Sequence, residues 1–150
     1  MKGSDTKLNK DEFVLALMAA ADGDAHQPVQ IQKLLFLADD KIGSQLGGPF
    51  FHFRPYDYGP FDSDVYHTLE RLEVDGKVEI IRGGWAKRTY RLTAEGQRLG
   101  EGVMGTLRPG TGEYMKALSA WVRSLSFSEL VSAVYKAYPD MRENSVFVEC

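Results

Sequence analysis

The chain has 150 residues, of which 43% are hydrophobic and 26% charged, and its formal net charge at pH 7 is −3. This composition is typical of a globular domain with a real core, and the net charge excludes bulk electrostatic attraction to nucleic acid. The single cysteine, Cys150, excludes an intrachain disulfide and a thiolate metal cluster. The N-terminus is polar and no apolar run is long enough for a membrane span, so we expect one cytoplasmic domain over residues 1–150 without membrane contact.

The first part of the chain predicts two helices. Apolar residues at helical spacing between 13 and 21 indicate the first, with Asn9 or Asp11 as its N-cap. Pro28 suits the first turn of the second helix, because its fixed φ matches helical geometry. Gly43 or Gly47–Gly48 ends that helix, and its predicted buried stripe consists of Ile31, Leu34, Leu35, Ala38 and Ile42.

The aromatic stretch F-F-H-F-R-P-Y, residues 50–56, predicts a short extended piece, and Tyr58, Gly59 and Pro60 predict a tight corner after it. Gly59 and Pro60 impose the corner, since glycine accepts unusual dihedral angles and proline fixes its own. A third helix is expected to begin at Asp62 or Ser63 and to stop at Gly76. Its predicted apolar face consists of Phe61, Val65, Leu69 and Leu72.

Residues 78–92 change to a β-type pattern, in which two runs flank Gly83–Gly84, and this predicts a hairpin. Thr93 caps a short helix after it, residues 99–112 read as a turn or linker, and residues 113–150 predict C-terminal helices with Ser126 and Glu129 as a capping box. The resulting fold is mainly α with a small β-hairpin: a winged helix-turn-helix core over residues 8–98 plus additional C-terminal helices.

One stretch of the chain, residues 65–96, resembles the third helix and wing of PadR- and MarR-type regulators. The similarity rests on V-Y-H-T-L-E-R-L-E-V-D-G and on the closing Y-R-L-T-A-E-G. It implies a winged-helix fold.

A second resemblance covers more of the chain. I-Q-K-L-L-F-L-A at 31–38, followed by Y-D-Y-G-P-F at 56–61, looks like the Panacea domain of SocA-type antitoxins, and V-Y-K-A-Y-P-D with N-S at 134–145 is similar to the tail of that group. The resemblance implies a non-enzymatic adaptor or regulator whose partner is a toxin or a protease.

The predicted third helix is acidic, and a phosphate backbone would repel its surface. Aromatic side chains before and on this helix are of the kind that concentrate binding energy at protein interfaces, although at least two of them are expected to fill the core. We therefore predict a protein partner as the first hypothesis. The predicted partner-binding residues are Tyr56, Asp57, Tyr58, Tyr66, Glu70 and Asp75.

The alternative is a DNA-binding transcriptional regulator of PadR or MarR type that acts as a dimer. Arginines of a wing can enter a minor groove or contact phosphates. The apolar stripes at 114–125 and 130–138 can form a homodimer interface, or they can equally cover the core of a single domain. The predicted DNA-contacting residues of the hairpin are Arg82, Trp85, Lys87 and Arg88.

The sequence contains no pattern that indicates catalysis. His26, His52 and His67 lack the i, i+4 spacing of a helical metal site, and Asp57 has no second carboxylate or histidine at a spacing that forms a pair. The letters G-E-G-V-M-G at 100–105 match a dinucleotide fingerprint, but a predicted helix precedes them where that motif requires a strand. We therefore predict no enzymatic activity, no cofactor and no metal.

Overall fold

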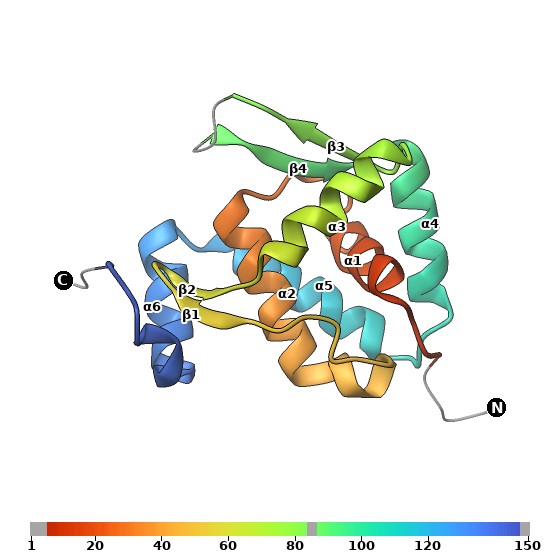
Figure 1. The fold of residues 1–150 in the computed structure, drawn as a ribbon. Helices are drawn as coiled ribbons and strands as arrows, with labels where there is room; N and C mark the ends of the chain where they lie inside the picture. The colour runs from red at the N-terminus through yellow and green to blue at the C-terminus, as the bar shows by residue number, and fades with distance from the viewer. Residues whose placement is uncertain (1–5, 84–86, 148–150) are drawn as a thin grey trace.

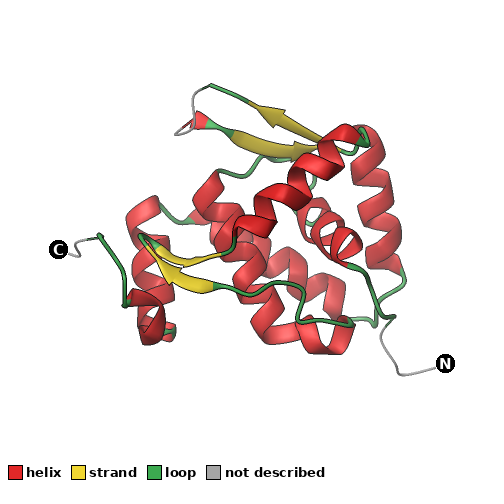
Figure 2. Ribbon diagram, in the orientation of Figure 1, coloured by secondary structure: helices red, strands yellow, loops and turns green. Residues whose placement is uncertain are grey.

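The computed structural model describes residues 6–83 and 87–147, and this part of the chain is mainly helical (Figures 1 and 2). It contains six α-helices: α1 (Lys10–Ala19), α2 (Pro28–Ile42), α3 (Ser63–Val74), α4 (Ala94–Gly105), α5 (Thr111–Ser124) and α6 (Phe127–Ala137). Two antiparallel hairpins pair β1 (Arg54–Tyr56) with β2 (Gly59–Phe61) and β3 (Val78–Ile81) with β4 (Thr89–Leu92). Short 3₁₀ helices, η1 (Gly43–Leu46) and η3 (Pro139–Arg142), follow α2 and α6.

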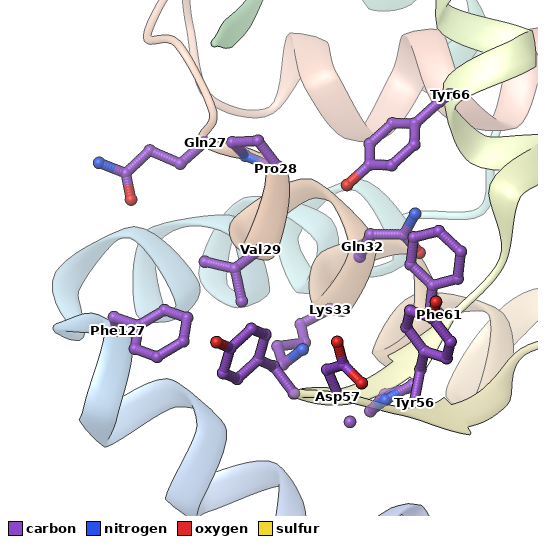
Figure 3. Close-up of a pocket in the computed structure, with 13 residues that line it drawn as sticks. Gln27, Pro28, Val29, Gln32, Lys33, Tyr56, Asp57, Phe61, Tyr66 and Phe127 are labelled. Carbon is purple, nitrogen blue, oxygen red and sulfur yellow. The ribbon is translucent and has the colours of Figure 1, made fainter. Parts of the chain in front are cut away.

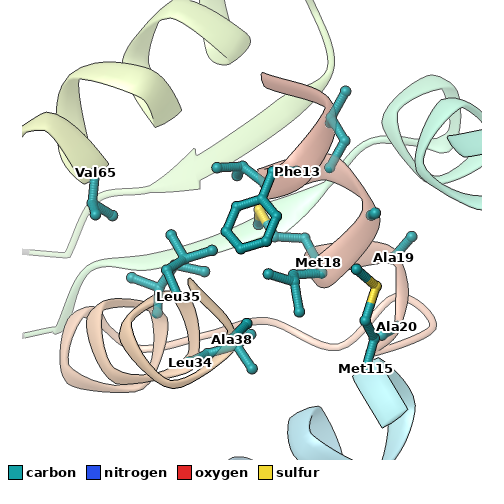
Figure 4. Close-up of a cluster of buried hydrophobic side chains, with 14 of the residues drawn as sticks. Phe13, Met18, Ala19, Ala20, Leu34, Leu35, Ala38, Val65 and Met115 are labelled. Atoms are coloured by element: carbon teal, nitrogen blue, oxygen red, sulfur yellow. The ribbon is translucent and has the colours of Figure 1, made fainter. Parts of the chain in front are cut away.

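Helix α1 is the centre of the core. Every residue from Phe13 to Ala19 is buried, because the helix is apolar all round and α2, α3, α4, α5 and β4 pack about it. Side chains from α1, α2, α3 and α5 meet in the cluster drawn in Figure 4. The stripe residues Val122 of α5 and Val134 of α6 are also buried within the chain, whereas Trp121 of the α5 stripe is 43% exposed.

Helix starts follow the predicted capping chemistry. Asn9 accepts the Glu12 N–H while Glu12 accepts the Asn9 N–H, which confirms Asn9 rather than Asp11 as the first cap. Ser126 and Glu129 form the same reciprocal pair at α6. Thr93 accepts the Gly96 N–H at the start of α4. These signals lie within four residues of sequence, and therefore the sequence alone locates the starts of α1, α4 and α6.

One prediction about the middle of the chain was incomplete and another was wrong. The extended piece and the turn before α3 are confirmed, but a second strand follows the turn and makes the hairpin β1–β2, whose three-residue strands are too short to give a periodic pattern. The predicted linker at 99–112 is helical up to Gly105, so the turn is confined to the residues between α4 and α5. Its glycines suggest a break in the helix, although one of them is a packing position: a Cβ on Gly100 would lie 2.4 Å from the Leu15 carbonyl oxygen of α1.

Helix α3 crosses the molecule beside the β3–β4 hairpin and is fixed to α1 by ion pairs (Figure 1). Lys10 binds the Asp64 carboxylate, and the Arg71 guanidinium lies 2.7 Å from Asp11. Helix α2 runs behind β1–β2 and contacts α5 and α6. Within residues 6–83 and 87–147, no helix combines the length and apolarity needed to cross a lipid bilayer.

Candidate functional site

A pocket of about 450 Å³ opens between the β1–β2 hairpin, the first half of α2, α3 and the start of α6 (Figure 3). Its volume lies in the range of pockets that bind small molecules or single anchoring side chains. Four of the six predicted partner-binding residues line it, namely Tyr56, Asp57, Tyr58 and Tyr66. The I-Q-K-L-L and Y-D-Y-G-P-F stretches, about 25 residues apart in sequence, therefore meet in one cavity.

One wall of the pocket is a row of stacked aromatic rings. The rings of Tyr56 and Phe61 stack with their centroids 5.0 Å apart, and Phe61 meets Tyr66 edge to face at 5.8 Å. Tyr66 in turn stacks on Tyr90 of the β3–β4 hairpin at 5.9 Å. Burial raises the pKa of Tyr66 to about 12, so its hydroxyl stays protonated and available as a donor. We call Tyr56, Phe61 and Tyr66 the hairpin row.

The opposite wall joins the hairpin tip to α6. The ring of Tyr58 contacts Phe127 edge to face at 5.2 Å, and both side chains remain about 40% exposed, at 41% and 42%. We call these two residues the α6 row. In Figure 3, Phe127 lies across the pocket from Tyr66, Phe61 and Tyr56, with Val29 and Lys33 of α2 between them. The cavity is therefore an aromatic slot with α2 as its floor.

Hydrogen bonds from backbone N–H groups hold the β1–β2 hairpin in place. Asp62 is the N-cap of α3, and its two carboxylate oxygens accept the N–H groups of Asp64 at 2.9 Å and His52 at 2.7 Å. At the tip of the hairpin, the carbonyl of Asp57 accepts the Val146 N–H at 2.9 Å. The slot therefore has a defined shape before any ligand enters it, which lowers the entropy cost of binding.

Lys33 lies on the floor of the slot and is the unexpected residue of the site. Its side chain sits among apolar groups and the residue is only 2% exposed, although it borders the pocket. Across the described ranges 6–83 and 87–147, it has no ion-pair or hydrogen-bond partner. Burial lowers the pKa of its ammonium group from 10.5 to about 7.

Gly59 lies next to the side chain of Lys33. Gly59 has a φ of +108°, a region that side chains disfavour. A Cβ at this position would lie 3.3 Å from the Tyr135 ring, 3.5 Å from Lys33 Nζ and 3.6 Å from Lys33 Cε. The backbone conformation and the close Tyr135 ring therefore favour glycine at this position, whereas the distances to Lys33 are ordinary contacts.

The other two predicted partner-binding residues are not part of this pocket. Glu70 lies on the exposed surface of α3, and Asp75 is exposed at its C-terminal end. The structure therefore brings the aromatic turn together with Tyr66, but it leaves the acidic surface of α3 as a separate feature.

The predicted DNA-contacting residues are partly engaged within the chain. The Arg82 guanidinium forms a two-point ion pair with Glu73 of α3, with nitrogen–oxygen distances of 2.8 and 3.0 Å. Arg88 is half-buried beside the hydroxyl of Tyr90, while Lys87 is exposed. Trp85 lies outside the described residues.

The histidines occupy unlike environments. His26 is fully buried, and both ring nitrogens lack a hydrogen-bond partner in the described part of the chain. Burial and the nearby Arg123 charge lower its pKa to about 4. His52 and His67 are exposed. Residues 6–83 and 87–147 contain no group of three or more His, Cys, Asp or Glu side chains that could hold a metal ion.

Sequence reasoning does not find Lys33 and Phe127 as site residues. An amphipathic pattern places Lys33 on the surface of its helix, but α2 is buried from Ile31 to Asp39. The available signal is that the residues three and four positions after Lys33 are Phe36 and Leu37, which belong to the same helical face and are buried. No protein-family model matches the chain, and a search of curated proteins found no significant match.

Proposed function

We propose that this protein is a non-enzymatic binding protein that holds a segment of a partner protein in the aromatic slot. The observation that carries the proposal is the convergence of the I-Q-K-L-L and Y-D-Y-G-P-F stretches on one pocket with exposed aromatic walls. Tyr56, Tyr58 and Phe127 are 54%, 41% and 42% exposed, so they offer apolar area that a partner can bury. Tyrosine-rich, preformed sites of this kind concentrate binding energy.

We further propose a winged-helix architecture and an adaptor or regulator role similar to that of Panacea proteins. The chain order α1, α2, α3 and then the β3–β4 hairpin, with α3 packed against β3, supports the winged-helix assignment. The two stretches that resemble the Panacea domain supply the floor and rim of the slot, which supports a partner of the class bound by that group, a toxin or a protease.

DNA binding by a dimer through the β3–β4 hairpin is the less supported function. Arg82 is already paired with Glu73, and Glu70 adds negative charge near the same hairpin. Lys87 is exposed and remains available to a phosphate. A duplex would therefore meet few free cations here, whereas affinity for DNA depends on several.

Site-specific photo-crosslinking in cells tests the proposed function. A photoreactive amino acid replaces Tyr58 at the rim of the slot, and the control replaces Val74, an 86% exposed apolar residue of α3 outside the slot. We expect one protein to be crosslinked from position 58 and not from position 74, and we expect Phe127→Ala to reduce that product. The double variant Lys87→Glu, Arg88→Glu should retain it.

Two results would contradict the proposal. One is an equal set of products from positions 58 and 74, which would indicate random encounter. The other is salt-sensitive retention of a DNA duplex that disappears in the double variant Lys87→Glu, Arg88→Glu while Phe127→Ala leaves it unchanged.

A further inference from the structure

The ammonium group of Lys33 lies at the floor of the slot, and no described residue of the slot gives it an ion pair or a hydrogen bond. Among the described residues, Lys33 is the only lysine or arginine that lines the slot, and no carboxylate of those residues forms an ion pair with it. A buried ammonium without a counter-charge is unfavourable, because it has lost water and gained no partner. A ligand with a negatively charged group would supply the counter-charge that Lys33 lacks.

The fold adds positive potential in the same place. Gln27, Pro28 and Val29, at the N-terminal end of the 15-residue helix α2, line the slot. The N-terminal end of a helix carries partial positive charge and favours an anion within its first turn. Asp57 is the one carboxylate among the described lining residues, and it is exposed in the β1–β2 turn rather than paired with the lysine.

The walls define the rest of the ligand. The hairpin row and the α6 row present aromatic rings on both sides of the floor, so the space between them favours an apolar or aromatic group. A neutral apolar ligand would fill the walls but leave the ammonium unpaired, and a cationic ligand would be repelled by it. The ligand must therefore combine an anion with an adjacent apolar group.

We propose that the slot binds a carboxylate that is attached to an apolar or aromatic group, with the carboxylate against Lys33 Nζ and the apolar group between the two aromatic rows. The identity of its carrier rests on the proposed function: in the partner protein, the group is the C-terminal residue. A C-terminal residue carries its carboxylate and its side chain on the same carbon atom, which matches one cation beside apolar walls. An internal Asp or Glu has only an aliphatic stem to offer those walls.

Nuclear magnetic resonance of lysine side chains tests the pairing with a defined probe. The probe is N-acetyl-L-phenylalanine, and its matched neutral control is N-acetyl-L-phenylalaninamide. We expect saturable shifts of the Lys33 signal with the acid, binding of the amide that is weaker by about 10- to 100-fold, and a rise in the pKa of Lys33 when the acid is bound. Both probes are compared on the unmodified protein, so this comparison does not depend on a variant that must fold.

Two substitutions test whether the tighter binding of the acid depends on Lys33. Lys33→Met should weaken binding of the acid by at least about tenfold and leave binding of the amide unchanged. The control is Lys136→Met, which removes an exposed lysine of α6 and should change neither. Equal binding of acid and amide by the unmodified protein would overturn the proposal, as would absence of saturable binding or full retention of acid binding by Lys33→Met.

A second comparison distinguishes a chain end from a free organic acid. It uses a hexapeptide that ends in phenylalanine with a free C-terminus, the same hexapeptide with an amidated end, and 3-phenylpropionate. A free hexapeptide that binds more tightly than 3-phenylpropionate assigns the carboxylate to a chain end. Tighter binding of 3-phenylpropionate overturns the chain-end assignment and leaves the pairing with Lys33 in place.

The two proposals fail separately. A partner crosslinked from position 58 in both Lys33→Met and the unmodified protein would remove the carboxylate pairing but keep the slot as a protein-binding site. Binding of N-acetyl-L-phenylalanine without any partner at position 58 would do the opposite.

Discussion

Gln32 and Asp62 hold each other through two hydrogen bonds, each 3.0 Å long. The Gln32 side-chain amide donates to the Asp62 carbonyl, and the Asp62 N–H donates to Gln32 Oε1. One buried side chain of α2 therefore satisfies both backbone groups of the residue that caps α3. This contact fixes the hairpin row relative to the floor of the slot.

Replacing Gln32 with leucine removes both bonds, so the Asp62 N–H loses its partner, while the Asp62 carbonyl still accepts the Val65 N–H. We expect the free energy of unfolding to fall by about 1–3 kcal/mol, the usual cost of unsatisfied polar groups in a partly buried place. Urea denaturation measures the change. Gln45→Leu is the matched control, because Gln45 is exposed on η1 and should change stability by less than about 0.5 kcal/mol. Equal effects of the two substitutions would show that the double hydrogen bond contributes nothing.

Lys33 should make the protein more stable as the pH rises. Its folded-state pKa is about 7 and its ordinary value is 10.5, so between these values the unfolded chain binds more protons than the folded chain. The free energy of unfolding therefore increases with pH across the window from 7 to 10.5. Lys33→Met should flatten this dependence and stabilise the protein at pH 7 by about 2–4 kcal/mol.

Denaturant titrations at a series of pH values between 7 and 10 measure this slope. Lys136→Met, which alters an exposed lysine, should keep the slope of the unmodified protein. A slope that is the same in Lys33→Met and in the unmodified protein would contradict the burial of the charge.

His26 should act in the same direction as Lys33, but at lower pH. Its folded-state pKa is about 4 against an ordinary 6.5, so the unfolded chain binds the extra proton between these values. The free energy of unfolding should therefore fall as the pH falls from 6.5 to 4. His26→Leu should lose part of this fall and His67→Leu should not, since His67 is exposed. Thermal unfolding at pH 4.5 and 7 compares the three proteins, and identical losses in all three would be inconsistent with a buried neutral imidazole.

Gly100 and Gly102 should differ sharply when each is replaced with alanine. A Cβ on Gly100 would lie 2.4 Å from the Leu15 oxygen and 2.7 Å from the Ala19 Cβ, whereas nothing lies within 4 Å of a Cβ on Gly102. Gly100→Ala should destabilise the protein by more than about 2 kcal/mol, because α4 must move away from α1. Gly102→Ala should stabilise it by about 0.5–1 kcal/mol through helix propensity. Chemical denaturation of the two variants would refute close α1–α4 packing if both became more stable.

The helix starts and the β3–β4 hairpin could be predicted because their signals are local. Asn9, Thr93 and Ser126 each bond an N–H three residues ahead. A glycine in the sequence can indicate either the end of a helix or a close contact between two helices. Gly76, with a φ of +77°, follows the end of α3, whereas Gly100 lies inside α4 where it contacts α1. Which meaning applies depends on a neighbouring helix far away in the sequence.

The rim of the candidate site could be predicted, but its floor could not. The aromatic and glycine–proline composition of residues 54–61 is a local signal, and it indicates Tyr56 and Tyr58 as candidates from the sequence alone. For Lys33 the only local signal is the apolar pair Phe36 and Leu37 on its helical face, because the burial of a helical residue depends on how many other elements cover the helix. Helices α5 and α6 and strand β2 cover the faces of α2 that a simple amphipathic pattern leaves to water.

The carboxylate of Asp62 has one further consequence. It binds the His52 N–H on one side and the Asp64 N–H on the other, so the segment between them is a loop whose two ends are fastened at a single point. The exposed rings of Tyr56 and Tyr58 lie beyond that fastening and contribute little to it. If Tyr56 and Tyr58 bind a partner as proposed, these two residues can change with little effect on the hydrogen bonds that hold the loop, so that partner specificity and stability would vary independently.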